Sequence, residues 1–168
     1  MFFSAAIAAC LILSGCQQKP VDNKLDLSGQ QLKKVPNYVF QLTNLEELNI
    51  SNNQITGALQ AETGNLKNLK VLKADNNLMT GIPAEIGQLP KLQVFNIGHN
   101  LLAGVPKEIG QAQSLQMLDL SNNQLTGLPL EMGSLKNLQT LNISGNNYSS
   151  SDLDTISGSL TTSTNIIK

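Results

Sequence analysis

The chain repeats itself with a period of 23 residues, and this period constrains its fold more than any local preference does. One extra residue interrupts the period near Ala58, and a degenerate unit precedes the regular ones. A unit of this length cannot bury its apolar residues alone, so successive units must stack into a solenoid with a continuous core. The regular units start at Leu45, Leu69, Leu92, Leu115 and Leu138.

Each unit contains two segments with a predictable structure. Alternation such as Leu118-Asp119-Leu120 predicts a short strand with one buried face, and equivalent strands should pair in parallel about 4.8 Å apart. Pro83, Pro106 and Pro129 each stand two residues before a glutamate, which suits the first turn of a short helix. We therefore expect a parallel sheet on the concave side and short helical or irregular segments on the convex side.

An asparagine follows each predicted strand. Its amide can both donate to and accept from turn backbone that would otherwise be buried unpaired. We expect His99, which stands in the neighbouring column with Asn52, Asn76 and Asn122, to be a turn residue at a strand end. The asparagines of the predicted structural ladder are Asn53, Asn77, Asn100, Asn123 and Asn146.

The pattern L-x-x-L-x-L-x-x-N-x-L resembles leucine-rich repeats, and LTGxPxEIGxL is similar to the repeats of plant receptor ectodomains and their bacterial relatives. The resemblance implies an α/β solenoid, a horseshoe with about six repeats over residues 24–148. Residues 149–168 then form a C-terminal cap. We expect a capping box from Ser151 to Asp154, a helix reaching about Leu160, and an edge strand at Asn165-Ile166-Ile167.

The first 15 residues have the character of an export signal. The apolar run from Phe2 to Leu13 is shorter than the roughly 20 residues of a spanning helix but matches a signal peptide. Its end, Leu13-Ser14-Gly15-Cys16, resembles the bacterial lipobox, which implies a lipid on Cys16 and a short tether over 16–23. No lysine or arginine precedes Lys19, unlike the basic start of most signal peptides, and a buried apolar segment is the alternative.

The composition argues against several functional classes. A net charge of −1 does not favour nucleic acid. Both cysteines lie in the first sixteen residues, the chain has one histidine, and it has no phosphate-loop pattern. Asp75 and Asp119 lie in neighbouring columns but are too few to indicate a cation site. We therefore expect no enzyme activity, no metal and no cofactor.

The outward positions of the strands remain as a candidate binding face. One column is apolar at its centre, and the next column is polar. Leucine-rich repeats commonly bind proteins or peptides through this face, so the resemblance implies a monomeric, lipid-anchored binding protein of the bacterial envelope, on the outer membrane or cell surface. The alternative is a structural or adhesive surface lipoprotein without one specific ligand. The candidate binding residues are Val71, Val94, Met117, Lys73, Asn96 and Asp119.

Overall fold

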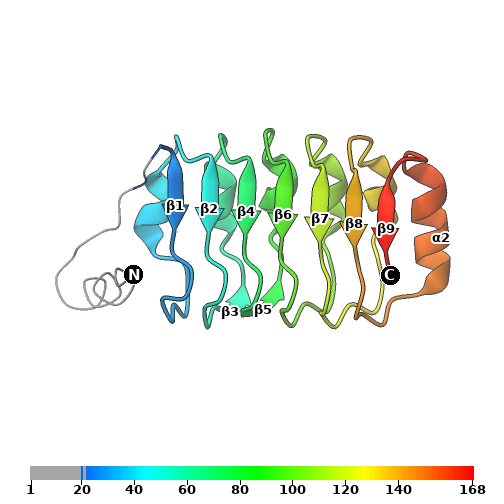
Figure 1. Ribbon diagram of the computed structural model, residues 1–168, viewed down its shortest axis with the longest axis horizontal. Helices are drawn as coiled ribbons and strands as arrows, with labels where there is room; N and C mark the ends of the chain where they lie inside the picture. Colours follow the sequence, from blue (N-terminus) through cyan, green and yellow to red (C-terminus); the bar gives the residue numbers. More distant parts are fainter. Residues whose placement is uncertain (1–19, 21) are drawn as a thin grey trace, which may run out of the picture.

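The computed structural model describes Pro20 and residues 22–168. The predicted signal peptide, Cys16 and most of the tether lie outside the described residues. The described chain forms a curved solenoid, with a sheet on one side and short helices on the other (Figure 1). No helix in this part of the chain is long and apolar enough to span a membrane.

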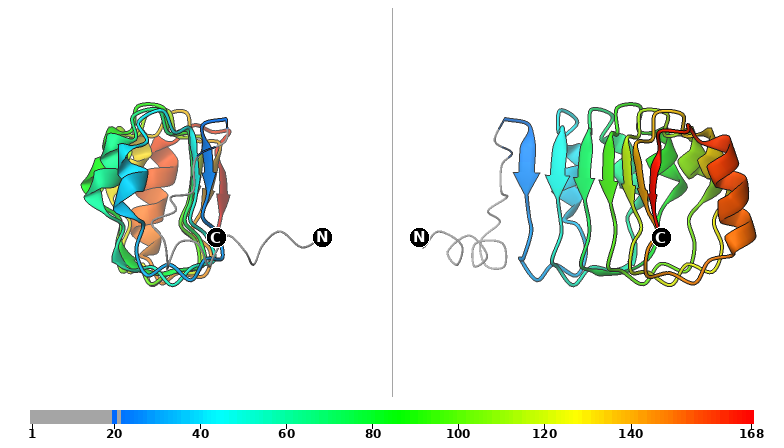
Figure 2. Two further views of the ribbon diagram at one scale, coloured as in Figure 1. Left: turned by 90° about the vertical axis from the view of Figure 1, so that its left-hand side faces the viewer. Right: turned by 45° about the vertical axis from the view of Figure 1, so that its right-hand side comes forward.

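A seven-stranded parallel sheet lines the concave side, as the repeat pattern predicts. The middle residue of each repeat strand, such as Leu72 in β4 or Phe95 in β6, is buried in the core. The residues on either side of it in these two strands are half-buried. Seen along the solenoid, the sheet and the helices form opposite sides of the molecule (Figure 2). The strands, in sheet order, are β1 (Lys24–Asp26), β2 (Glu47–Asn49), β4 (Val71–Lys73), β6 (Val94–Asn96), β7 (Met117–Asp119), β8 (Thr140–Asn142) and β9 (Asn165–Ile167).

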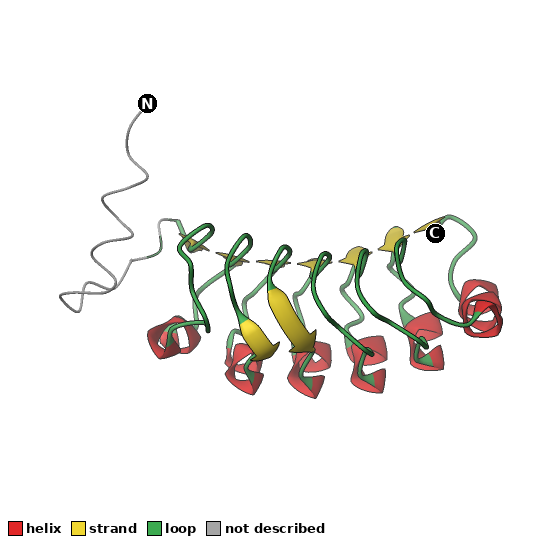
Figure 3. Ribbon diagram, turned by 90° about the horizontal axis from the view of Figure 1, so that it is seen from below, coloured by secondary structure: helices red, strands yellow, loops and turns green. Residues whose placement is uncertain are grey.

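The convex side consists of 3₁₀ helices (Figure 3). A proline in extended conformation precedes each helix except one, where Gln60 takes this place. The Gln60 amide accepts from the Val35 N–H at 2.9 Å and donates to the Val35 carbonyl at 3.1 Å, so it ties the helix start to the preceding repeat. The helices are η1 (Asn37–Gln41), η2 (Ala61–Asn65), η3 (Ala84–Gln88), η4 (Lys107–Gln111) and η5 (Leu130–Ser134).

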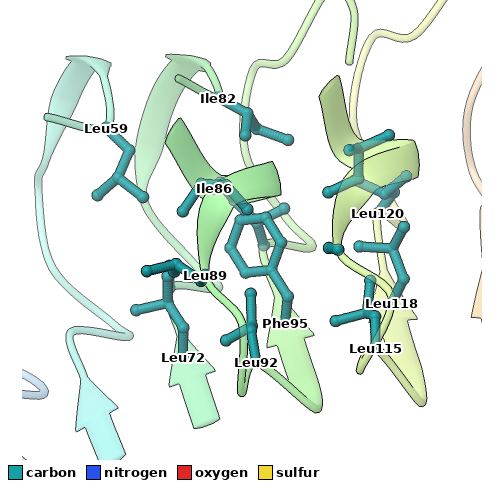
Figure 4. Close-up of a cluster of buried hydrophobic side chains, with 14 of the residues drawn as sticks. Leu59, Leu72, Ile82, Ile86, Leu89, Leu92, Phe95, Leu115, Leu118 and Leu120 are labelled. Carbon is teal, nitrogen blue, oxygen red and sulfur yellow. The ribbon is translucent and has the colours of Figure 1, made fainter. Parts of the chain in front are cut away.

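The leucines and isoleucines of all repeats form one continuous core between the sheet and the helices. Phe95 lies inside it, surrounded by side chains from the neighbouring repeats such as Leu72 and Leu118 (Figure 4). These three side chains are fully buried. The core therefore runs along the solenoid, and each repeat depends on its neighbours for burial.

A second, two-stranded parallel sheet joins β3 (Thr56–Ala58) to β5 (Leu78–Gly81), which the sequence pattern did not predict. Its register shifts between Gly57 and Ala58, next to the one-residue insertion in the repeat period. Gly57 has a φ of +74°, a conformation that favours glycine.

The C-terminal cap consists of α2 (Ser150–Ser159) and the edge strand β9, which pairs in parallel with β8 as predicted. The predicted capping box at Ser151 is wrong, because the helix begins at Ser150 and Ser149 is the N-cap residue, without a side-chain capping bond. The Ser151 hydroxyl contacts the Ser149 hydroxyl at 2.7 Å. Asp152 accepts from the Leu128 N–H at 3.2 Å, so it fastens the cap to the preceding repeat.

From η2 onward, successive helices stack through a glycine at the same position of each repeat, where η1 has Phe40. A Cβ atom on Gly110 would collide with the backbone carbonyl of Glu131, and a Cβ on Gly87 would collide with that of Glu108. Backbone atoms move only when the whole repeat shifts, so these glycines set the distance between repeats.

We predict that Gly110→Ala lowers the free energy of unfolding by about 1–3 kcal/mol, the usual cost of overpacking. Gly104→Ala is the matched control, since nothing lies within 4 Å of its Cβ position and its φ is not positive. Chemical denaturation of both variants measures the difference. Equal stability of the two variants would mean that the repeats do not approach each other at Gly110.

Candidate functional site

The candidate site is the outward face of the concave sheet. Strand pairing places Val71 beside Val94 and Val94 beside Met117, in one column of three consecutive repeats. Val71 and Val94 are half-buried, and Met117 is 42% exposed. We call these three residues the apolar strip. The structure therefore brings together the apolar half of the predicted site.

The next column is polar because its side chains close the strand ends. Asn96 Oδ1 accepts from the Gly98 N–H at 3.1 Å, and Asp119 Oδ1 accepts from the Ser121 N–H at 2.9 Å. Asn142 does the same for Ser144 at 3.2 Å. An Asx turn of this kind satisfies backbone that leaves the strand. Asn96 and Asp119, which we predicted as binding residues, thus also have a structural role that the sequence analysis missed.

Lys73 occupies the same column but forms no Asx turn; its side chain pairs with Glu47. Its Nζ lies 3.1 Å from Glu47 Oε1, while Lys24 Nζ lies 3.2 Å from Oε2. The hydrogen bond from Lys73 lowers the pKa of Glu47; partial burial acts in the opposite direction, and contact with Lys24 lowers it further. Partial burial raises the pKa of Asp26, but hydrogen bonds from the Ser28 hydroxyl and N–H outweigh it, so the pKa is lowered. Charges at the N-terminal end of the face are therefore paired within the protein.

His99 is a turn residue, as its column predicts. It has a φ of +53°, and Asn52, Asn76 and Asn122 have φ values of 51° to 56° at the same position of their repeats. Asparagine and histidine are among the residues that tolerate this left-handed conformation best. The His99 ring Nε2 lies 3.2 Å from Asn122 Nδ2.

The predicted ladder asparagines connect each repeat to the preceding one. Asn100 is only 5% exposed, and its Oδ1 accepts from the Met79 N–H at 2.9 Å. Its Nδ2 lies within hydrogen-bonding distance of the carbonyls of Ala74 (3.1 Å), Ile97 (3.1 Å) and Gly98 (3.2 Å). The same arrangement recurs at Asn53, Asn77, Asn123 and Asn146.

A further set of side-chain bonds runs along the edge where the chain enters the strands. Asn68 donates to the Thr43 carbonyl at 2.9 Å, Ser114 to the Pro90 carbonyl at 2.7 Å, and Asn137 to the Gln113 carbonyl at 2.8 Å. The leucine spacing does not predict these contacts. The recurrence of a small polar residue just before the first leucine of a repeat was the available signal.

Within the described residues, no three His, Cys, Asp or Glu side chains form a group that could hold a metal ion. Cys16, the predicted lipidation site, lies outside the described part of the chain.

Comparison with known proteins agrees with the geometry. A family model described as "Leucine rich repeat" matches residues 23–79, and one described as "Leucine Rich repeats (2 copies)" matches residues 113–158. Bovine leucine-rich repeat-containing protein 10 is 38% identical over 61 residues, which cover 36% of this chain and 22% of the bovine protein.

Two solved structures show the same architecture over most of the chain. A leucine-rich-repeat protein of Leptospira interrogans is 35% identical with a TM-score of 0.72, covering 85% of this chain and 42% of that one. The ectodomain of the Arabidopsis receptor kinase HAESA, solved with an IDA peptide hormone ligand, is 29% identical with a TM-score of 0.71 and covers 85% and 25%. The chain spans less than half the length of each of these relatives.

The protein is therefore a solenoid of leucine-rich repeats. Domains of this class generally serve as scaffolds for protein interactions.

We predict that Asn100→Leu lowers the melting temperature, because the buried Met79 N–H loses its acceptor at a cost of about 1–3 kcal/mol. The carbonyls of Ala74, Ile97 and Gly98 each lose one of their donors as well. Thermal unfolding followed by circular dichroism is the measurement. Asn65→Leu, at an exposed position on the convex side, is the control and should unfold close to the wild type. An unchanged melting curve for Asn100→Leu would show that this amide is solvated.

Proposed function

We propose that this chain is a non-enzymatic binding module that captures a protein or peptide on the concave face of its sheet. The observation that carries the proposal is the apolar strip, which remains accessible at Met117 in the middle of a polar face. Exposed apolar residues rimmed by polar ones are typical of interface cores, and methionine adapts to varied partners. The HAESA ectodomain, which has a similar structure, was solved with a peptide ligand.

We further propose that the module is a lipoprotein of the bacterial envelope, anchored through Cys16 on the outer membrane or cell surface. The Leu13-Ser14-Gly15-Cys16 sequence supports this proposal. Residues 17–23 span at most about 25 Å when fully extended. A monomer tethered in this way would meet its partner close to the membrane.

A structural or adhesive lipoprotein without one specific ligand is the second candidate. The regularity of the polar column favours it, and so does the size of the face. Seven strands about 4.8 Å apart and five residues in height give about 500 Å², below the roughly 800 Å² that each partner buries in a standard interface. A pull-down with the chain from residue 17 separates the two: one reproducible stoichiometric partner indicates a module, and diffuse binding to surface material indicates adhesion.

We predict that Val94→Asp abolishes capture of the partner while leaving stability within about 0.5 kcal/mol, because an outward strand position contributes little to the core. Leu101→Asp is the control, since Leu101 is 39% exposed beyond the end of the same strand. Pull-down and thermal unfolding of both variants make the test. Loss of capture with Leu101→Asp alone would place the contact on the loop edge.

We predict that Cys16→Ser shifts the protein from the membrane to the soluble fraction, or leaves an uncleaved precursor, because no thiol remains for lipid attachment. Cell fractionation with immunoblotting shows both location and size. Cys10→Ser is the matched control and should leave the distribution unchanged. A Cys16→Ser protein that stays membrane-bound at mature size would refute the lipid anchor.

A further inference from the structure

Two carboxylates lie on the concave face beside the apolar strip. Asp75 and Asp119 belong to the repeats on either side of the one that carries Val94, Asn96 and Gly98. Asp75 Oδ1 accepts from Asn96 Nδ2 at 3.1 Å, and Asp119 Oδ2 accepts from Asn142 Nδ2 at 3.1 Å. Both side chains are partly exposed. We call Asp75 and Asp119 the acidic pair.

The fold does not require the negative charge of the acidic pair. Asp119 closes its Asx turn with one oxygen, and Asn49, Asn96 and Asn142 close the equivalent turns with an amide oxygen. Asp75 stands in a column whose other members are serine or glycine. An asparagine would therefore keep the Asx turn at Asp119 and lose only the bond from Asn142 Nδ2. A small neutral residue occupies the position of Asp75 in the other repeats.

No lysine compensates the acidic pair in the described part of the chain. The ion pairs there join Lys24 and Lys73 to Glu47 and Lys70 to Glu46. The chain contains no arginine. Lys73 lies on the strand just before Asp75, yet its Nζ contacts Glu47 in the preceding repeat at 3.1 Å. The negative charge of the acidic pair thus remains available to a partner.

Glycine at position 98 avoids a steric conflict with the Asp119 carboxylate. A Cβ atom at residue 98 would lie 3.1 Å from Asp119 Oδ1 and 2.9 Å from the Ser121 hydroxyl. Because glycine has no Cβ, the Asp119 carboxylate can lie against Gly98, in the repeat between Asp119 and Asp75. Asp75 and Asp119 therefore flank the same repeat, Asp75 next to Asn96 and Asp119 next to Gly98.

We propose that the acidic pair and the apolar strip form one site for a linear peptide segment that carries lysine or arginine within two positions of an apolar residue. This inference rests on the proposed binding function. Met117 and Asp119 are two residues apart on one strand, about 7 Å, which is also the separation of alternate side chains in an extended peptide. Charge complementarity would supply specificity, and the apolar contact would supply the core of the interface.

The experiment presents a display library of random octapeptides to the full-length chain immobilised in nonionic detergent. We expect the recovered sequences to be enriched, relative to the input library, in lysine or arginine within two positions of an aliphatic or aromatic residue. A synthetic peptide from this set should bind about three- to tenfold more weakly when its basic residue is replaced by glutamine.

A double-mutant cycle ties this effect to the acidic pair. Combined Asp75→Asn and Asp119→Asn should weaken the basic peptide by the same factor and leave the glutamine peptide unaffected. Glu131→Gln, on the exposed convex side, is the control and should change neither peptide. Added salt should reduce the difference between the two peptides on the wild-type protein.

The outcomes separate the inference from the proposed function. Peptides that require Val94 but show no basic preference, or an acidic one, would overturn the inference and leave the binding function in place. A double variant that unfolds would show that the charges are structural and would also overturn it. Failure to recover any peptide whose binding Val94→Asn, a neutral polar substitution of similar size, abolishes would overturn both.

Discussion

The buried asparagine amide at the end of each strand is the contact on which the solenoid depends. It satisfies backbone donors and acceptors of two consecutive repeats at once, as Asn100 does for Met79 and Ala74. An apolar side chain at this position would leave the Met79 N–H unpaired in the core, at a cost of about 1–3 kcal/mol, and would remove one of the donors to the Ala74 carbonyl. The ladder therefore holds the repeats in one register, and this register makes columns out of equivalent residues.

The columns separate the residues that recur for structural reasons from those that differ between repeats. The ladder, the Asx turns and the stacked glycines account for most of the recurring residues. The positions that depart from the repeat are then few, and on the concave face they include Val94 and Met117 in the apolar strip and Asp75 in the acidic pair. If the chain binds a partner as proposed, specificity would lie in these departures, because they can change without disturbing the stacking.

Much of this architecture could be predicted from the sequence because the repeat converts local pattern into spatial position. The spacing of the leucines predicts the strand register that places Val94 between Val71 and Met117. The parallel sheet, the convex helices and the edge strand β9 are confirmed in the structure. The turn position of His99 follows from the same alignment of columns.

Features that depend on contacts between repeats could not be predicted in this way. The small sheet of β3 and β5 requires two loops to approach each other, which no pattern within one repeat specifies. The helix α2 begins before the predicted capping box, and its Asp152 bonds to the Leu128 N–H of the preceding repeat, a contact that local propensity does not include. The double role of Asp119 appeared only once its oxygens were placed against Ser121 and Asn142.

The central claim is that the concave face contacts the partner at the apolar strip. Site-specific photo-crosslinking tests it most directly, with a photoreactive residue at position 94 and, as the reference, at position 131 on the convex side, in cells that produce the protein. The account predicts one discrete crosslinked product from position 94 and none of that mass from position 131. A discrete product from position 131 alone, or only a diffuse smear from position 94, would contradict it.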